Sequence, residues 1–489
     1  MNETDVLVLG TGNAALVAAL AAHEQGAKVT ILERAPQERR GGNSAFSGGI
    51  FRFAFREFDE IRPFLTESPT LPFTKAEVEP YGPDAFHNDL MRVTEGLADP
   101  NLSQFLVENS LPTVSWMATQ GITWELHPTH ASERGGKFIW RSGTVPVEAR
   151  GGGRGLVDML LASVEKNGIP IIYRTRATGL LTDQSGTVGG VVAHTAEGKK
   201  EYRSKAVVLA CGGFEANPEM RARYLGAGWD LVKVRGTRFN TGDGIRMALE
   251  AGAMPFGHWS GCHASVIDAE APNVEAAATE VSRYSYPFCV MVNREGDRFV
   301  DEGEDLQVYT YAKTGRRILE QPGSIAYQIF DKKTAPLLRS PYQQSRPLIA
   351  QSIEELADGL AIDVERLKRN IEAFNRAAEG GEFDSSKRDG KSTRGIFPPK
   401  SNWAVPIDTP PFQAYAVNCG ITFTYGGCRI DEQGRVLTGE DRVIPGLWAA
   451  GEITGGFFYH NYPSGSGLTR GAVTGRVSGL AAARYAKGR

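Results

Sequence analysis

The feature that most constrains the fold is a short apolar segment near the start of the chain, followed at once by closely spaced glycines. Residues 6–9, Val-Leu-Val-Leu, suit a strand buried on both faces, and the alanine-rich residues 14–25 suit a helix. Between them, Gly10 permits a tight turn, Gly12 lets the backbone approach a pyrophosphate, and Ala15 keeps helix and strand in contact. Phosphates then meet free N–H groups at the positive end of the helix. The segment predicts a dinucleotide site.

A second strand and a glycine-rich loop extend this pattern. Residues 29–32 read Val-Thr-Ile-Leu, and Glu33 follows the glycines at about 20 residues, where an acid hydrogen-bonds ribose hydroxyls. The loop 41–49 has small residues and hydroxyls but almost no apolar bulk, so it can lie against a flat or phosphorylated ligand. These features alone are equally consistent with binding of NAD and binding of FAD.

Composition narrows the class of protein. The length of 489 residues allows two or three domains. The formal net charge of −3 does not indicate the basic surface that binds nucleic acid, so we expect no nucleic-acid partner. The chain enters a strand by residue 5 without a signal peptide and has no apolar run of about 18 residues, so we expect no membrane span and a cytoplasmic location. Five cysteines lie far apart without a C-x-x-C pair, which argues against disulfides, zinc or a Cys-ligated cluster.

Segments in the N-terminal half and near the C-terminal end of the chain share one pattern, an apolar run followed by glycine. Residues 206–213 form an apolar segment that runs into paired glycines, and residues 446–452 repeat that pattern before a last, alanine-rich helix. The residues between alternate aromatic and β-branched side chains and contain a hairpin turn at 295–297. We therefore expect a nucleotide-binding domain in two parts, with another domain inserted. The predicted domains are 1–257, 258–423 and 424–489.

Helix signals fill several of the remaining segments. Capping residues and apolar spacing predict helices at residues 85–95, 102–120, 156–167, 245–251 and 364–379. Residues 140–155, which end in Arg-Gly-Gly-Gly-Arg-Gly, are expected to form a flexible connection before the helix at residues 156–167.

A series of motifs stands in a fixed order along the chain. The motifs are Gly10-x-Gly12-x-x-Ala15, Glu33, Gly41-Gly-Asn-Ser with Ser47-Gly-Gly49, Ala210-Cys-Gly-Gly213, Asn240-Thr-Gly-Asp-Gly244, Val292-Asn-Arg-Glu-Gly-x-Arg-Phe299, Gly427, and Gly451-Glu452 with Gly465-Ser-Gly467. This order resembles the succinate dehydrogenase/fumarate reductase flavoprotein family over nearly the whole chain. The resemblance implies FAD, an α/β fold with a Rossmann-like FAD-binding domain split between both chain ends, and an inserted α+β capping domain that binds substrate.

The resemblance also assigns residues to the cofactor. It implies a helix that opens at residues 466–468 toward the flavin pyrimidine, where its N-terminus stabilises negative charge on the reduced ring. Membrane-bound members attach FAD to a histidine in the region of the loop 41–49, and because this loop contains none, we expect non-covalent FAD. The expected cofactor residues are Gly10, Gly12, Asn13, Ala14, Ala15, Glu33, Arg34, Asn43, Ser44, Ser47, Gly48, Gly49, Ala177, Ala210, Cys211, Gly212, Asp243, Gly451, Glu452, Ser466, Gly467 and Leu468.

On the substrate side the chain departs from the fumarate reductases of this family. Their proton-transfer arginine falls on Tyr311, their later carboxylate-binding arginine on Tyr462, and their paired histidine on Phe423. The fumarate clamp is therefore incomplete. Tyrosines at both places resemble the ketosteroid dehydrogenases, where one tyrosine is a base and another polarises a carbonyl. A tyrosine has an ordinary pKa near 10, so a base of this kind needs a nearby cation, for which Lys313 and Arg283 are candidates.

Other polar residues complete the expected substrate site. His263 falls near a substrate-binding histidine of the family, and Thr279-Glu280 with Arg283 match a Thr-Glu-x-x-Arg pattern that binds carboxylate and relays protons. The expected catalytic residues are Tyr311, Tyr462, His263 and Arg283, and the expected substrate-binding residues are His263, Thr279, Glu280, Thr424, Tyr425, His460, Tyr462 and Arg470. The candidate cations for a polycarboxylate, which the sequence does not rank, are Arg141, Arg235, Arg283, Arg346 and Arg470.

The substrate-side segments are most similar to those of the tricarballylate dehydrogenases within the family. The resemblance implies oxidation of a small carboxylate, of the tricarballylate to cis-aconitate type, and transfer of electrons to a separate membrane iron–sulfur or haem protein. Two alternatives keep the flavin chemistry: a ketosteroid-type dehydrogenase that forms an enone, and a fumarate-type reductase of an unsaturated acid. A third alternative is a protein whose flavin is only structural.

Overall fold

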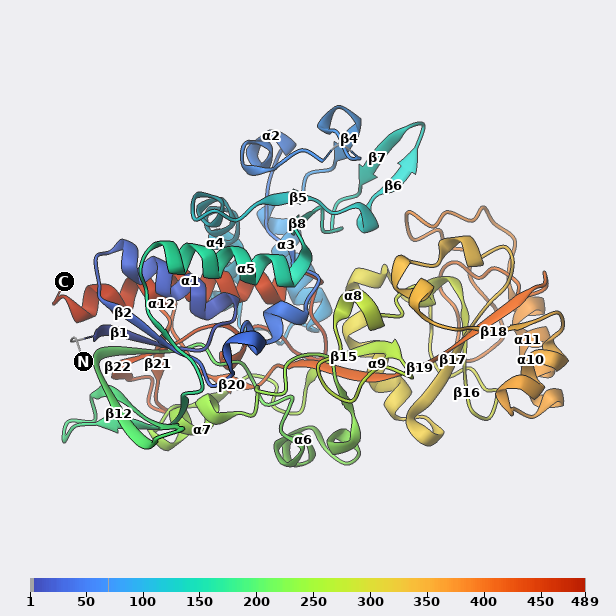
Figure 1. The fold of residues 1–489 in the computed structure, drawn as a ribbon. Coiled ribbons are helices and arrows are strands. Elements are labelled where there is room, and N and C mark those ends of the chain that lie inside the picture. Colours follow the sequence, from blue (N-terminus) through green and yellow to red (C-terminus); the bar gives the residue numbers. More distant parts are fainter. Residues whose placement is uncertain (1–3, 69, 489) are drawn as a thin grey trace. The chain divides into compact units, whose positions relative to one another are not determined.

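The protein is described here by a computed structural model that covers residues 4–68 and 70–488. Two compact units divide the chain. Unit 1 comprises residues 1–230, 236–262 and 423–489, and unit 2 comprises residues 231–235 and 263–422. The chain therefore leaves unit 1 and returns to it near its C-terminal end (Figure 1).

Unit 1 is built on an eight-stranded sheet that joins both ends of the chain. Its strand β1 (Thr4–Leu9) lies between β2 (Val29–Leu32) and β12 (Gly198–Leu209) and runs parallel to both. On the other side of β12, β22 (Val443–Ala449) is also parallel. The apolar residues 6–9 of β1 are buried, as their pattern predicts. The sheet that residue 4 begins is thus completed by a strand from the last fifty residues.

Helices α1 (Asn13–Glu24), α5 (Gly152–Lys166) and α12 (Ser466–Ala486) lie together over one face of this sheet (Figure 1). Helix α12 approaches α1 so closely that only glycine fits between them. A Cβ atom on Gly475 would lie 2.5 Å from the carbonyl oxygen of Ala14, and one on Gly479 would lie 2.2 Å from that of Ala18. The two helices therefore pack backbone to backbone.

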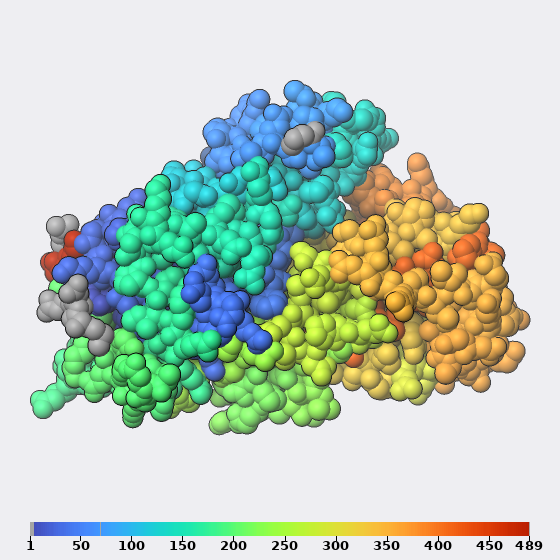
Figure 2. Space-filling model, viewed as in Figure 1, coloured from blue at the N-terminus to red at the C-terminus, as the bar shows by residue number. Residues whose placement is uncertain are grey.

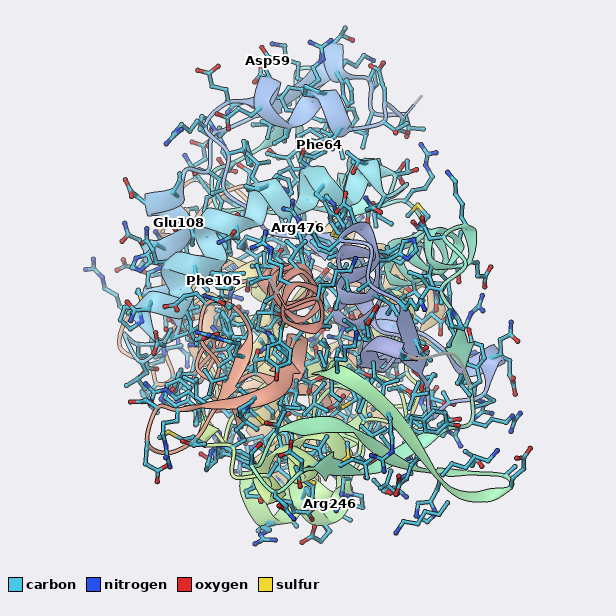
Figure 3. The ribbon with its side chains drawn as sticks, turned by 90° about the vertical axis from the view of Figure 1, so that its left-hand side faces the viewer. Asp59, Phe64, Phe105, Glu108, Arg246 and Arg476 are labelled. Atoms are coloured by element: carbon cyan, nitrogen blue, oxygen red, sulfur yellow. The ribbon has the colours of Figure 1, made fainter. Side chains whose placement is uncertain are left out.

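Residues 50–150 add a lobe to unit 1. It holds a three-stranded sheet of β3 (Ile50–Phe51), β8 (Val147–Ala149) and β5 (Trp124–Leu126), and a second one of β4 (Ala76–Val78), β7 (Lys137–Trp140) and β6 (Ser132–Arg134). The light blue and cyan surface in Figure 2 belongs to this lobe. Its helix α4 (Pro100–Thr119) reaches α12, where Arg476 donates to the carbonyl of Pro112 at 3.1 Å and lies over the ring of Trp116 (Figure 3).

Unit 2 is organised around β19 (Phe412–Thr424), the long strand of a six-stranded sheet. Strands β17 (Ile325–Phe330), β18 (Leu348–Ala350) and β13 (Lys233–Val234) pair with it. Helices α10 (Ile353–Leu360) and α11 (Val364–Ala377) contribute Leu356, Leu367 and Phe374 to the core of the unit, and all three are buried. The result is a sheet covered by helices that are local in sequence, an α+β unit.

The other elements have the following bounds. The helices are α2 (Phe58–Ile61), α3 (Pro83–Val93), α6 (Pro218–Leu225), α7 (Asp243–Glu250), α8 (Ala278–Val281) and α9 (Tyr311–Leu319). The strands are β9 (Ile171–Ile172), β10 (Arg176–Thr182), β11 (Val188–Thr195), β14 (Pro255–Phe256), β15 (Cys262–Asp268), β16 (Val290–Asn293), β20 (Gly427–Cys428) and β21 (Arg435–Leu437). Within the described residues, no helix has the length and apolar character needed to cross a bilayer.

Two sequence expectations are corrected by this fold. Residues 152–155 are not a flexible connection, because α5 already begins at Gly152. The reason for glycine there is packing: a Cβ on Gly153 would lie 2.2 Å from the carbonyl oxygen of Ser44. Residues 231–235 were expected in the first part of the nucleotide-binding domain, but Lys233 and Val234 pair with Gly420 and Ile421 of β19 and belong to unit 2.

Candidate active site

The turn after β1 shows why glycine stands at position 10. Gly10 has φ of 109°, and a Cβ there would lie 2.6 Å from the carbonyl oxygen of Ala210, at the end of the neighbouring strand β12. A side chain is excluded by both the backbone conformation and the neighbour. Gly212, with φ of 76°, is fixed in the same way, because its Cβ would lie 2.3 Å from the amide of Asn240. These glycines serve the protein's own packing.

Two other glycines are not required by the protein and so test whether a cofactor fits. A Cβ on Gly12 would approach nothing closer than Ser44 Oγ at 3.5 Å, and one on Gly467 nothing closer than the ring of Phe423 at 3.5 Å. Both are ordinary contact distances, and each glycine stands at the N-terminal end of a helix, α1 or α12. The space that they leave open suits a pyrophosphate at α1 and a flat ring at α12, as an FAD site requires.

Asn13 ties these two helix ends together. Its backbone N–H donates to Ser44 Oγ at 3.0 Å, and its side-chain Nδ2 donates to the carbonyl oxygen of Leu468 at 2.8 Å. Ser47 in turn donates to the carbonyl of Ser44 at 2.7 Å. The expected cofactor residues 13, 44, 47 and 468 are thus brought together from three separate segments of unit 1.

Glu33 ends β2 with a buried carboxylate. It accepts hydrogen bonds from Thr11 Oγ1 at 2.5 Å and from the N–H of Ala35 at 2.6 Å. Burial raises its pKa, while the bonds from Thr11 and Ala35 oppose that rise. Each carboxylate oxygen keeps acceptor capacity for a ribose hydroxyl.

Asp243, expected to accept cofactor hydroxyls, is engaged differently. Its Oδ2 accepts from Arg34 Nη1 at 2.9 Å, and Arg176 binds both of its oxygens at 2.7 and 2.8 Å. Two guanidinium groups bind the carboxylate and link α7 to the ends of β2 and β10, and direct contact of Asp243 or Arg34 with the cofactor stays a prediction. Ala177, half-buried on β10, follows Arg176 directly.

The remaining expected cofactor residues lie near the end of β12 and in the segments beside β3 and β22. Burial raises the pKa of Cys211 to about 12, so its thiol is protonated at neutral pH. Asn43 donates from Nδ2 to Glu215 Oε1 at 2.5 Å and accepts from the N–H of Thr237 at 2.8 Å. Gly48, Gly49 and Gly451 stand in the loops beside β3 and β22. Gly49, with φ of 70°, is fixed by the close approach of Gly152.

Glu452 follows β22 and faces a second buried carboxyl group that sequence reasoning missed. Its Oε1 accepts from the N–H of Thr424 at 2.8 Å and from Thr424 Oγ1 at 3.2 Å. Thr424 was expected to bind substrate, but its donors are used here. The second carboxyl belongs to Glu215, which is completely buried and whose pKa is raised well above its ordinary value by burial and then by the charge of Glu452. Its position just after the carboxyl end of a parallel strand was the available signal.

Arg470 is a buried cation of unit 1 that is surrounded by aromatic rings. Only 2% of it is exposed, its guanidinium lies over the rings of Phe458 at 4.9 Å and Phe423 at 5.4 Å, and its Nε and Nη1 are buried without a hydrogen-bond acceptor. Burial lowers its pKa to about 10, against the opposing charge of Glu452, so it stays protonated at neutral pH. A buried guanidinium with unused donors is suited to an anion.

Tyr462 packs beside this arginine. Its ring makes edge contacts with Phe423 at 4.9 Å and Phe458 at 5.2 Å between centroids, and the side chain is 6% exposed. Tyr462 also interacts electrostatically with Arg470. His460 is exposed, with its ring 4.6 Å from that of His258, and the ring of Tyr425 lies 5.4 Å from Phe423. The structure thus gathers Tyr425, Tyr462 and Arg470 around Phe423.

Unit 2 holds a separate cluster around His263. Its ring lies 4.8 Å from that of Tyr311, which lies 5.2 Å from that of Tyr284. Ser265 Oγ is 3.2 Å from His263 Nε2 and 2.5 Å from the hydroxyl of Tyr284. Burial, with the charge of Arg235, lowers the pKa of His263 well below its ordinary value, so the imidazole is neutral near pH 7. Ser265 and Tyr284 were not predicted as site residues.

The other expected residues of unit 2 have structural partners or lie at the surface. Arg283 is buried and bonds to Asp268 and Ser345, so most of its donors are engaged in unit 2, and its catalytic role stays a prediction. Lys313 pairs with Glu304 at 2.7 Å at the surface, and Thr279 and Glu280 are exposed on α8.

The candidate arginines can now be ranked. Arg141 pairs with Glu79 at 2.6 Å, Arg346 is exposed, and Arg235 is buried with Nε on Thr422 at 2.8 Å. Arg283 keeps a buried Nε without an acceptor but is paired with Asp268 through Nη2, whereas Arg470 has both Nε and Nη1 buried without an acceptor, so Arg470 ranks first for binding an anion.

Comparison with known proteins agrees with this site. The model of the FAD binding domain family matches residues 5–468. Fumarate reductase (cytochrome) of Shewanella frigidimarina is 28% identical over 497 residues, covering 99% of this chain and 78% of that protein. The 3-oxosteroid 1-dehydrogenase of Mycolicibacterium smegmatis is 26% identical over 566 residues, covering 96% and 95%. The open conformation of a flavocytochrome c3 fumarate reductase superposes with a TM-score of 0.74 at 26% identity, covering 99% of this chain and 79% of that one.

The comparison and the geometry lead to the same cofactor. Both helix ends that the glycines leave open lie within the matched residues, and the relatives are oxidoreductases that act on carbon–carbon bonds. FAD is therefore the cofactor, and unit 1 is its Rossmann-like domain, split by the inserted unit 2. The chain belongs to the FAD-binding flavoproteins of the succinate dehydrogenase/fumarate reductase family.

Proposed function

We propose that the protein is a dehydrogenase that introduces a double bond into a small polycarboxylate, of the tricarballylate to cis-aconitate type. The observation that carries the proposal is Arg470, a buried guanidinium with unused donors beside an aromatic group of unit 1. A carboxylate that accepts from Nε and Nη1 supplies both missing acceptors and the missing negative charge in one contact.

The proposed chemistry divides between the cofactor and the protein. FAD, when bound, supplies the oxidant that accepts a hydride from one carbon of the substrate. The neighbouring carbon loses a proton, and we assign its acceptance to a tyrosine. We assign Tyr462 as the base, because it packs against Phe423 and Phe458, the same rings that the cationic Arg470 contacts.

A second candidate keeps the base and changes the substrate. Tyr462 lies among the rings of Phe423 and Phe458, surroundings that also suit an apolar ring, and the 3-oxosteroid 1-dehydrogenase is among the relatives. An enone-forming dehydrogenase of this kind does not require the charge of Arg470. A reductase of an unsaturated acid would require that charge but would run in the opposite direction.

Anaerobic mixing of the purified yellow protein with single compounds decides among these functions. Tricarballylate is expected to bleach the flavin absorbance, whereas a 3-ketosteroid is not. Bleaching by the ketosteroid alone would replace the proposal with the second candidate. If none bleaches and cis-aconitate or fumarate reoxidises a chemically reduced sample, the reductase is correct.

Two matched variants test whether the buried guanidinium of Arg470 binds the substrate. Arg470→Met is expected to raise the dissociation constant for tricarballylate about a hundredfold, because it removes a charged donor from a buried site, and to leave FAD bound. Arg476→Met changes an arginine of the same helix that contacts α4 instead, and is expected to leave the constant unchanged. Equal behaviour of the two variants would remove the role of Arg470.

We also propose that the electrons leave to a separate iron–sulfur or haem protein. Among residues 4–68 and 70–488 no group of histidine, cysteine and acidic side chains is arranged to hold a metal, and the first of the relatives above is named as a cytochrome enzyme. Reoxidation of the reduced protein by membranes of its host, but not by protease-treated membranes, is the expected result.

A further inference from the structure

Glu215 and Glu452 form a buried carboxyl pair in unit 1. Glu215 follows β12, Glu452 follows β22, and these strands are neighbours in the parallel part of the sheet. The side chain of Glu215 is completely buried. Gly213 leaves room for Glu452 and Thr424, because a Cβ there would lie 2.1 Å from Glu452 Oε1 and 2.2 Å from Thr424 Oγ1. Two interacting carboxyl groups that are both buried cannot both be charged at low cost.

The surroundings of Glu215 decide which of its oxygens holds a proton. Oε1 accepts two N–H bonds, from Asn43 Nδ2 at 2.5 Å and from Asn240 Nδ2 at 2.6 Å. Oε2 is buried and receives no hydrogen bond from a donor within the described residues. An ionised Oε2 would therefore be a buried charge without a donor, whereas a protonated Oε2 becomes a donor itself.

Glu452 is the acceptor in the pair. Its Oε1 accepts from Thr424, and the positive charge that acts on it is that of Arg470. Burial, followed by the charge of Glu452, raises the pKa of Glu215 well above its usual range, in agreement with the geometry. Burial also raises the pKa of Glu452, but the bonds from Glu215 and Thr424 and the charge of Arg470 oppose that rise.

We propose that Glu215 is a cofactor-positioning residue: it keeps a proton on Oε2, donates it in a hydrogen bond to Glu452, and so holds one ionised carboxylate ready for the hydroxyl groups of FAD. The proposal rests on the hydroxyl-binding role of Glu452 and is independent of the substrate. Asn43 and Asn240 set the orientation of Glu215 by occupying Oε1. Asn43 thereby connects the glycine-rich loop 41–49 to the pair.

Glu215→Gln is the decisive variant, because glutamine reproduces the protonated form. Its Oε1 accepts from both asparagines and its amide donates to Glu452. Titration of FAD into the apoprotein, followed by flavin fluorescence, is expected to give the wild-type dissociation constant within about threefold. Glu215→Leu, which removes the donor, is expected to raise it about tenfold or more. If Glu215 were ionised, Glu215→Gln would weaken FAD binding as much as Glu215→Leu, and the proposal would be wrong.

A spectroscopic readout tests the proton directly and does not depend on activity. The infrared difference spectrum of wild-type minus Glu215→Gln apoprotein is expected to contain the C=O band of a protonated carboxyl group, which shifts in D2O. Glu219→Gln, an exposed position on α6, is the control and should give no such band. Absence of the band from the wild-type difference spectrum would overturn the proposal, whatever the folding of Glu215→Leu.

Failure of the substrate proposal would look different. A protein that binds FAD normally, shows the protonated carboxyl band and does not react with tricarballylate would keep the role of Glu215 and lose the polycarboxylate. The Glu452→Leu variant tests whether Glu452 binds the hydroxyl groups of FAD. If this variant binds FAD as the wild type does, that role of Glu452 is wrong, and the proposed role of Glu215 is wrong with it.

Discussion

The side-chain Nδ2 of Asn13 donates to the carbonyl oxygen of Leu468 at 2.8 Å, across 455 positions of sequence. This bond fixes the N-terminal end of α1 against the first turn of α12. Both ends are open where the FAD pyrophosphate and ring are expected. This amide group therefore adds a direct link between the two ends to the backbone packing of the helices at Gly475 and Gly479.

Asn13→Asp is expected to raise the FAD dissociation constant about tenfold, because a carboxylate oxygen then faces the Leu468 carbonyl and adds negative charge near a pyrophosphate. Fluorescence titration of the apoprotein measures it. Asn109→Asp is the matched control, since Asn109 Nδ2 also donates to a backbone carbonyl, that of Phe105 at 2.9 Å. Equal constants for both variants would show that the bond does not matter for the cofactor.

Gly12→Ala separates cofactor binding from folding. A Cβ fits at position 12 at ordinary contact distance, and φ of −75° is allowed for alanine, so the stability of the apoprotein should change by no more than about 0.5 kcal/mol. FAD affinity should fall at least about tenfold, because the methyl group occupies space for the pyrophosphate. Thermal unfolding of the apoprotein and FAD titration measure the two effects. Unchanged FAD affinity would contradict a cofactor at this helix end.

Gly479→Ala tests the contact between α12 and α1. Its Cβ would meet the Ala18 carbonyl oxygen at 2.2 Å, and relieving that clash should cost about 2 kcal/mol of unfolding free energy. Gly189→Ala is the control, because its Cβ would meet nothing closer than 3.9 Å. Denaturant unfolding is expected to separate the two variants clearly. A stable Gly479→Ala protein would mean that the two helices can move apart without loss.

Asp268→Asn tests the ion pair of unit 2. Removing the carboxylate leaves the buried Arg283 without its counter-ion and should cost about 3 kcal/mol. Burial alone would raise the pKa of Asp268, but the bonds from Ser345, Glu270 N–H and Arg283 outweigh it and lower the pKa. The pair therefore stabilises the fold above the ordinary pKa of an aspartate, and this contribution is lost as the pH falls through the lowered value. The variant should lack that acid-dependent step in an unfolding series against pH.

Tyr462→Phe tests the proposed base. Rapid mixing with the substrate should show flavin reduction slowed by about 10² or more, with FAD binding unchanged, because only a hydroxyl is removed. Tyr415→Phe, at a tyrosine packed against Phe330 and Tyr342 in unit 2, should reduce at the wild-type rate. A Tyr462→Phe protein with full turnover would transfer the role to Tyr311 or Tyr284.

The FAD-binding unit could be anticipated because its signals are local. The strand, turn and helix of residues 4–24 follow from the apolar run and from Gly10, and the bounds of α4 and α11 follow from caps at Asp99 and Asp363. The start of α5 could not, because three closely spaced glycines normally indicate a loop. Only the approach of Ser44 to Gly153 shows that glycine is needed there.

The polar groups of the site were harder to predict, because their roles depend on neighbours that are distant in sequence. Asp243 has the right spacing for a cofactor ligand, but the structure shows that its carboxylate also binds Arg34 and Arg176. Arg283 and Arg470 look alike in sequence, and they differ because Asp268 lies beside one and aromatic rings beside the other. No periodicity encodes these pairings. Glu215 was missed for the same reason.

The packing of α12 on α1 has a consequence for the order of events during synthesis. The ribosome completes residues 263–422, a continuous stretch with its own sheet and core, before it makes β22 and α12. Unit 2 can therefore fold while β1, β2, β12 and α1 still lack the strand and helix that cover them. Until the last residues emerge, the nascent chain has the open helix end at Gly12 but lacks the one at Gly467. The complete FAD site can therefore form only after α12 has been made, because one of its two helix ends belongs to α12.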